Sequence, residues 1–219
     1  MTDYPPEPWN LAGQAYVSTW RVPLPDLPAL PEGAEPVVLG GKAVVVTAWI
    51  DYRKPGQLTY HELLSTVAVR GRRAAASITE IWVDSKVSLA GGRALWGIPK
   101  DLATLPFHEG RTFTASASTE DDWNATAAFT RRVGVPLAAP AAFDVVQTLG
   151  GRPRRSPVRA KARPHLASAN WNINPDGPLG YLAGRRPVAS MILRDFEIKF
   201  GGETHSPSRS HPSVRRAAI

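Results

Sequence analysis

Lys100 is the residue of this chain whose sequence surroundings best suit covalent chemistry. It follows Pro99 and the largely apolar run ALWGI at Ala94–Ile98. An ordinary lysine has a pKa of about 10.4, so at pH 7 only about one amine in 2,500 is free to attack a carbonyl carbon. A lysine whose pKa is lowered to about 7 has about half of its amines free, and burial or a neighbouring cation can supply that shift. The sequence therefore nominates Lys100 as a nucleophile, against the alternative of a surface lysine at a turn.

Other chemical motifs are missing from the sequence. The glycine pairs fit neither G-x-G-x-x-G nor a P-loop, and no G-x-S-x-G elbow is present. The chain has no cysteine, which excludes a disulfide scaffold, cysteine-ligated zinc and a thiol nucleophile. No spacing typical of a metal site links the five histidines, which are His61, His108, His165, His205 and His211. We therefore expect neither a metal nor another cofactor.

Short segments of alternating apolar and polar residues surround Lys100. This pattern predicts strands over residues 14–22 and 77–84 and two more between 103 and 134. Residues 87–95 are expected to form a short helix interrupted by Gly91 and Gly92, and residues 150–165 a basic loop containing prolines. The 219 residues predict one mostly β domain over 1–200, followed by a basic, flexible tail over 201–219.

The positive charge of the chain is concentrated in its last third. The net charge is +7, yet residues 1–150 carry 13 basic against 15 acidic residues, and residues 151–219 carry 13 against 4. No nucleic-acid-binding module accompanies this charge, so nucleic acid is not the expected partner. A basic polyanion-binding module, acting through residues 152–163 and 209–216, stays open as an alternative. No apolar run is long enough to span a membrane and no secretory signal is visible, so we expect a cytoplasmic protein.

The segment around Lys100 resembles the acetoacetate decarboxylase family. The motif runs from Trp82-Val83-Asp84-Ser85 through Ala90-Gly91-Gly92-Arg93 to Pro99-Lys100-Asp101-Leu102. In the family, a lysine at the position of Lys100 forms a Schiff base with a β-keto acid. The resemblance thus implies a mostly β (α+β) fold, in which a curved antiparallel sheet with few short helices closes into a barrel or cone around a central pocket. It also implies a homo-oligomer that needs no cofactor.

Six further residues have expected roles: the resemblance implies those of Arg21 and Glu62, and the Schiff-base hypothesis assigns those of the other four. Arg21, in YVSTWR, would face the substrate carboxylate, and Glu62, in YHELL, would line the pocket and shuttle a proton. Arg93 would assist substrate binding or buttress its turn. Water would be excluded by three aromatic residues, whose alternative role is core packing: Trp82, Trp96 and Phe107.

Two departures from the family pattern bear on the reaction. Asp101 replaces the family's second lysine, and the strand VVVTAWI offers Thr47 where decarboxylases tend to place a carboxylate. An anion close to Lys100 would oppose its activation, but two successive residues of one strand face opposite ways. The expected function is a Schiff-base-forming lyase acting on a keto acid or related carbonyl compound, by decarboxylation or by aldol, dehydration or cyclisation chemistry. A non-covalent small-molecule cyclase or binding protein on the same fold is the alternative.

Overall fold

The computed structural model describes residues 4–134 and 137–202, and in them β-strands predominate. The strands are β1 (Trp9–Pro23), β2 (Val38–Leu39), β3 (Lys42–Arg53), β4 (Tyr60–Val69), β5 (Ala75–Val83), β6 (Lys100–Leu102), β7 (Phe107–His108), β8 (Thr112–Ser118), β9 (Trp123–Gly134), β10 (Ala139–Leu149), β11 (Arg152–Ile173) and β12 (Ala189–Phe200). The helical segments are α1 (Lys86–Trp96) and two 3-10 turns, η1 (Leu24–Asp26) and η2 (Gly180–Leu182). The mostly β prediction is confirmed.

Seven of the strands form a closed ring. Their order is β10-β5-β4-β3-β1-β12-β11, and β10 pairs with both β5 and β11, which closes the circuit. The pairings around the ring are antiparallel except between β10 and β5, and the short β6 also joins β5 in parallel. The expected curved sheet that closes around a centre is therefore present.

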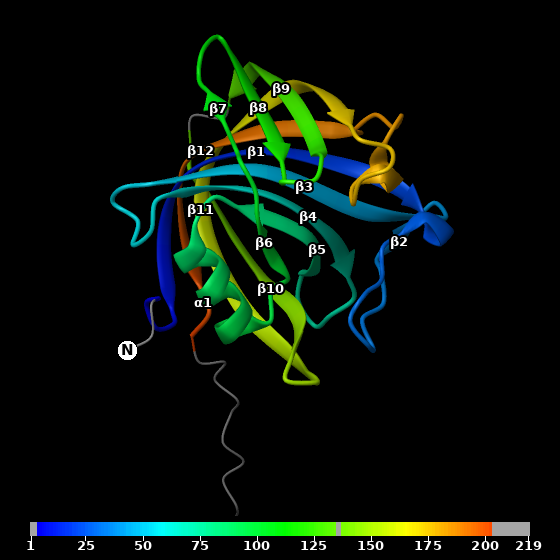
Figure 1. Ribbon diagram of the computed structural model, residues 1–219, viewed down its shortest axis with the longest axis vertical. Helices are drawn as coiled ribbons and strands as arrows, with labels where there is room; N and C mark the ends of the chain where they lie inside the picture. Colours follow the sequence, from blue (N-terminus) through cyan, green and yellow to red (C-terminus); the bar gives the residue numbers. More distant parts are fainter. Residues whose placement is uncertain (1–3, 135–136, 203–219) are drawn as a thin grey trace, which may run out of the picture.

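A second layer covers part of the outside of the ring. Strands β7, β8 and β9 continue the sheet from β11 and lie over β1 and β3 at the top of Figure 1; we call residues 107–134 the β7–β9 flap. A core rich in aromatic side chains fills the space between the flap and the ring, with Trp20, Trp49, Phe113 and Phe129 among its buried members. Successive side chains of β1 and β3 point alternately toward the flap and into the ring. Both strands are therefore buried on both faces.

The inside of the ring holds a separate apolar cluster. It includes Trp9, Ile50, Ile81 and Phe196, and α1 packs beside it below the strands in Figure 1. The helix begins at an N-cap, where the Ser85 side chain accepts a hydrogen bond from the Ser88 backbone N–H. The expected helix over 87–95 is thus present, and it lies at one end of the ring interior.

Residues 150–165 form a strand rather than the expected loop. From Arg152 onward they belong to β11, which pairs with β10 and, from Val158, also with β12. The prolines led to the wrong prediction. Residues 152–157 pair with β10 on one side only, and a proline is tolerated there when the position of its missing N–H faces the unpaired side. Buried Val158 and Ala162 alternate with exposed basic residues, as expected of a strand with one apolar face.

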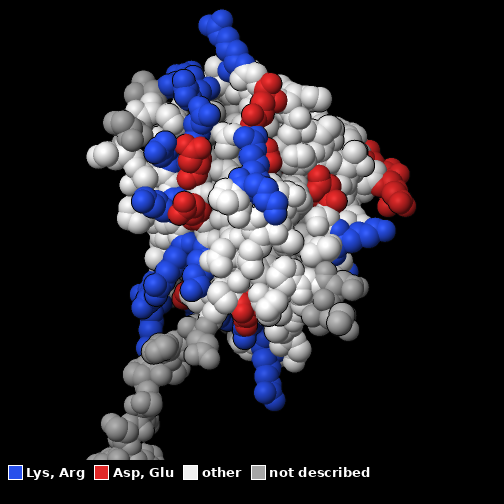
Figure 2. Space-filling model, turned by 90° about the vertical axis from the view of Figure 1, so that its left-hand side faces the viewer, with Lys and Arg blue, Asp and Glu red and all other residues white. Residues whose placement is uncertain are grey.

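The basic side chains of β11 do not form a uniformly positive surface. Arg154 pairs with Glu7 at 2.6 Å, and Arg163 pairs with Asp195 at 3.2 Å. Figure 2 shows Lys and Arg side chains interspersed with Asp and Glu on one face of the molecule. The second basic segment, 209–216, lies outside the described residues, as does the predicted tail beyond residue 202, so the domain boundary stays a prediction. None of the described helices has the length and hydropathy needed to cross a membrane.

Candidate active site

Strand β6 carries Lys100 into the ring interior. Lys100 pairs with Ile81 of β5 and is 4% exposed, whereas the next residue, Asp101, is exposed on the opposite side. Arg93 on α1 binds this outward face: its Nε donates to the Lys100 carbonyl oxygen at 2.7 Å, and its guanidinium pairs with the Asp101 carboxylate. The anion that replaces the family's second lysine therefore points away from the Lys100 amine, and Arg93 buttresses the strand that carries it.

The Lys100 amine has three close partners. Its Nζ donates to Glu62 Oε2 at 2.6 Å and to Ser88 Oγ at 2.9 Å, and it lies 5.2 Å from the centre of the Tyr60 ring. The side chains of Lys100 and Glu62 are 5% and 3% exposed, so water screens their interaction poorly. The resemblance nominated Lys100 and Glu62 separately, and the fold brings them into contact.

Two tyrosines complete the surroundings of Glu62. The Tyr52 hydroxyl donates to Glu62 Oε1 at 3.2 Å, and the Tyr52 ring stacks on Tyr60 with centres 4.4 Å apart. Burial, and next the charge of Glu62, raise the pKa of both tyrosines well above its ordinary value. Both hydroxyls therefore stay protonated and can donate hydrogen bonds to the carboxylate.

The glycine pair in α1 allows the helix to approach the site. A Cβ on Gly92 would lie 2.7 Å from Lys100 Cδ and 2.8 Å from its Cε, and a Cβ on Gly91 would lie 2.4 Å from the Trp9 ring. Glycine is unfavourable inside a helix by about 1 kcal/mol relative to alanine. Glycine is nevertheless present at two successive positions of α1, because any larger residue would displace the side chain of Lys100 or of Trp9.

A charged contact outside the ring secures the start of α1. His61, next to Glu62 on β4, meets Asp84 with Nδ1 and Oδ2 2.9 Å apart, and its backbone N–H donates to Asp84 Oδ1 at 2.8 Å. The hydrogen bond to Asp84 raises the pKa of His61 above its ordinary value despite partial burial. Burial alone would raise the pKa of Asp84, but the hydrogen bonds from His61 have the larger combined effect, so the pKa of Asp84 is below its ordinary value. This contact ties β4 to the turn that precedes Ser88.

The Lys100 amine opens onto a cavity of about 430 Å³ inside the ring. Trp96 lines this cavity and donates from its Nε1 to Glu7 at 2.8 Å. Trp82 and Phe107 do not line it; they pack in the core beneath the flap, which was their alternative role. Arg21 lies on β1 four residues beyond Val17, the last residue of that strand that lines the cavity, with its guanidinium near Gly40.

The family follows from comparison with known proteins. The model of the family described as acetoacetate decarboxylase (ADC) matches residues 6–153, more than half of the chain. The chain belongs to the acetoacetate decarboxylase family. No curated protein matches it by sequence.

Solved structures extend this likeness over the whole ring. An acetoacetate decarboxylase from Legionella pneumophila superposes with a TM-score of 0.70 at 16% identity, over 92% of this chain and 88% of that one. An acetoacetate decarboxylase-like enzyme from Sphingomonas wittichii RW1 gives 0.69 at 14% identity, over 92% and 93%. The enduracididine biosynthesis enzyme MppR, complexed with pyruvate, gives 0.66 at 21% identity, over 90% of each chain. These structures share the acetoacetate decarboxylase fold with this chain.

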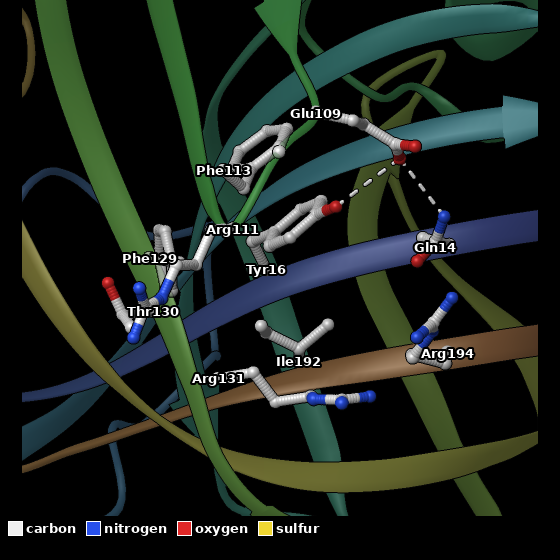
Figure 3. A pocket seen from close by; sticks show the side chains of 11 residues that line it. Gln14, Tyr16, Glu109, Arg111, Phe113, Phe129, Thr130, Arg131, Ile192 and Arg194 are labelled. Atoms are coloured by element: carbon white, nitrogen blue, oxygen red, sulfur yellow. Dashed lines mark hydrogen bonds between the residues drawn. The ribbon is translucent and has the colours of Figure 1, made fainter.

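A second pocket, of about 440 Å³, lies at the edge of the core beneath the flap (Figure 3). Its carboxylate, Glu109, accepts hydrogen bonds from Gln14 at 3.0 Å and Tyr16 at 3.5 Å and pairs with Arg53. Three of its lining residues are arginines, Arg111, Arg131 and Arg194. The lining of this pocket contains no lysine, whereas Lys100, the lysine of the family motif, lines the first cavity. Among the described residues, no cluster of His, Asp or Glu is arranged to hold a metal ion.

Ser88 and Tyr52 contact the pair of Lys100 and Glu62 but were missed by the sequence analysis. Ser88 lies one helical turn before Gly92, so it shares the helix face that meets Lys100. Tyr52 pairs directly with Tyr60 across β3 and β4, two positions from Glu62. Knowledge of the register between β3 and β4 would have identified Tyr52. A prediction that the helix begins after an N-cap at Ser85 would have placed Ser88 on the face of Gly92.

Proposed function

We propose that this chain is a Schiff-base-forming lyase, with Lys100 as the nucleophile toward a carbonyl compound. The observation that carries the proposal is the buried Lys100 amine, 2.6 Å from the Glu62 carboxylate and facing an apolar cavity. A nucleophile whose base is within hydrogen-bond distance is the general signature of covalent catalysis. Membership of the acetoacetate decarboxylase family supports the proposal that this arrangement is catalytic.

Glu62 provides both the base and the acid that the first step needs. The ammonium of Lys100 passes one proton to Glu62, and the free amine attacks the carbonyl carbon to give a carbinolamine. Glu62 returns its proton to the carbinolamine oxygen, which leaves as water, and the nitrogen becomes a protonated imine. A single carboxylate at 2.6 Å from Nζ can serve both transfers, since donor and acceptor stay within reach.

The buried charges are the same before and after this step. An ammonium paired with a carboxylate becomes an iminium paired with the same carboxylate, so no new charge is buried and none is left alone. The iminium then draws electrons from a neighbouring bond. Loss of carbon dioxide from a β-keto acid, or removal of a proton from the adjacent carbon, gives an enamine that can add to a second carbonyl.

The relatives support carbonyl chemistry of this kind. MppR has been solved with pyruvate and with the condensation product of pyruvate and imidazole 4-carboxaldehyde. A decarboxylase and a condensing relative thus share this chain's fold. Homo-oligomeric assembly and a cytoplasmic location stay predictions of the family resemblance.

The alternative is a protein that binds or cyclises its ligand without a covalent bond. One observation favours it: two of the three amine protons of Lys100 are already used, by Glu62 and Ser88, as in a purely structural ion pair. In that case Lys100 would hold the cavity wall in place and contact the ligand only electrostatically.

Trapping with sodium borohydride separates the two functions. The protein is incubated with acetoacetate, pyruvate and simple ketones, reduced, and analysed by intact-mass and peptide mass spectrometry. We expect one reduced adduct, located on Lys100 and missing from Lys100→Ala, while the exposed Lys42→Ala serves as the matched control. An absence of any adduct across the panel would favour the non-covalent alternative.

A further inference from the structure

The walls of the Lys100 cavity are apolar almost throughout. Aliphatic and aromatic side chains from β1, β3, β4, β5, β10, β11 and β12 make up nearly all of the lining. Three lining residues carry charge: Lys100 and Glu62, which pair with each other, and Lys161, which is exposed and also lines a surface pocket. Within the described part of the chain no arginine lines this cavity.

A small keto acid fits these walls poorly. Its carboxylate lies one or two bonds from the reacting carbonyl, so it would be placed beside Glu62, a like charge. Of the two lysines that line the cavity among the described residues, Lys161 is exposed, and Lys100 keeps its positive charge on the imine nitrogen, where Glu62 already neutralises it. Burying an unpaired carboxylate in an apolar site costs several kcal/mol.

The cavity is also large and elongated. Its volume of about 430 Å³ falls within the range of about 300–1,000 Å³ that is typical of sites for drug-sized ligands, whereas acetoacetate is a much smaller molecule. Its lining follows β10 from Val145 to Ala139, about 20 Å along a strand. Ala139, Pro140 and Ala141 are exposed, so this end opens to solvent, whereas Lys100 is buried.

We propose that the substrate is a ketone or aldehyde with an extended apolar body and no carboxylate beside the reacting carbonyl. The carbonyl carbon reaches Lys100 and the apolar body lies along β10 toward Ala139–Ala141. This inference rests on the proposed function, because it assigns the substrate class of the same site. The bond changes are those of imine formation: the C=N bond forms, and the carbonyl oxygen leaves as water.

A homologous series of ketones tests the inference. Propanone, 2-pentanone, 2-heptanone and 2-nonanone share one reacting group and differ only in apolar length. The concentration for half-maximal borohydride trapping should fall about fourfold for each added methylene, the fold-change that corresponds to about 0.8 kcal/mol. Acetoacetate and pyruvate should need higher concentrations than 2-nonanone. Trapping that is independent of chain length, or that favours the keto acids, would overturn the substrate assignment.

Neighbouring residues of β10 supply a matched pair of variants. Ala141 lines the cavity, whereas Ala142 is exposed and does not line it. Ala141→Trp should raise the half-maximal concentration of 2-nonanone about tenfold or more, and Ala142→Trp should leave it within about twofold. Equal effects of the two variants would refute the placement of the apolar body along β10.

A non-reacting ligand keeps the two proposals distinguishable. Binding of 2-heptanol and 2-nonanol, followed by tryptophan fluorescence and calorimetry, needs no imine. If the alcohols bind with the same dependence on length but ketones form no adduct, the Schiff-base proposal fails and the apolar ligand class stands. If ketones form adducts without any dependence on length, the substrate class fails and the Schiff base stands.

Discussion

The buried pair of Lys100 and Glu62 allows a double-mutant test of the site. The side chains are 5% and 3% exposed, with 2.6 Å between Nζ and Oε2. Replacing one partner by an apolar residue of similar size leaves the other charge buried without its counter-ion, which costs about 3–5 kcal/mol. Because whole domains are stable by only about 5–15 kcal/mol, Lys100→Met and Glu62→Leu should each lower the urea midpoint markedly.

The double variant should recover most of this loss. Lys100→Met with Glu62→Leu buries no charge, and such replacements are neutral or stabilising by about 1–4 kcal/mol. Against this gain, the hydroxyls of Tyr52 and Ser88 lose their partners, at about 1–3 kcal/mol each. Together the two effects should leave the double variant about 2 kcal/mol less stable than the wild type, far less than the sum of the two single losses, about 6–10 kcal/mol.

Urea unfolding of all four proteins, followed by tryptophan fluorescence, gives the coupling energy. A coupling of about 3 kcal/mol or more is the expected result. Losses that simply add in the double variant would show that the two side chains do not interact in the folded protein, and the proposed proton transfer would lose its basis. Carbonyl trapping should be absent in the double variant even though it folds.

Three further predictions concern residues around the site. Gly92→Ala should reduce borohydride trapping about tenfold or more, because the new Cβ would lie 2.7 Å from Lys100 Cδ. Asp101→Lys restores the family's residue but should leave the pH profile of trapping unchanged, since Asp101 faces away from the amine. His61→Gln should lower the free energy of unfolding more at about pH 5.5 than at about pH 8.5. The pKa of His61 is raised by its bond to Asp84, so this stabilisation is full below pH 6.5 and is lost as the pH rises through the raised value.

Each of these predictions has a control or a contrary outcome. Gly110→Ala adds a Cβ that would meet only the Thr112 carbonyl oxygen at 3.5 Å, an ordinary contact, and should not affect trapping. A shift of the trapping profile in Asp101→Lys would mean that the new ammonium acts on the Lys100 amine. Equal losses for His61→Gln at both pH values would show that the charge of His61 does not stabilise the fold.

Local pattern was a reliable guide to the elements just before Lys100 and a poor one to residues 150–165. The strand over 77–84 and the helix over 87–95 could be predicted because their periodicity and the Ser85 cap are local. The prolines of β11 led to the prediction of a loop. The alternation of apolar and basic residues in β11, which indicates a strand, is just as local but was given less weight than the prolines. The contact between Lys100 and Glu62 depends on the pairing of β4, β5 and β6, which no single segment determines.

Most of the walls of the Lys100 cavity lie outside the motif around Lys100. Lys100, Ser88 and Gly92 lie within the family motif, and together they hold a buried amine against the helix face of α1. A little under half of the residues that line the cavity come from β10, β11 and β12, which close the ring after the motif has ended, and the others come mainly from β1, β3, β4 and β5. The motif therefore bears on the proposed chemistry of the lysine, while the apolar walls around it, those of β10–β12 included, bear on the proposed substrate class. For this reason the arginine expected to hold a carboxylate, Arg21, is a weaker guide to the substrate than the strand that opens at Ala139.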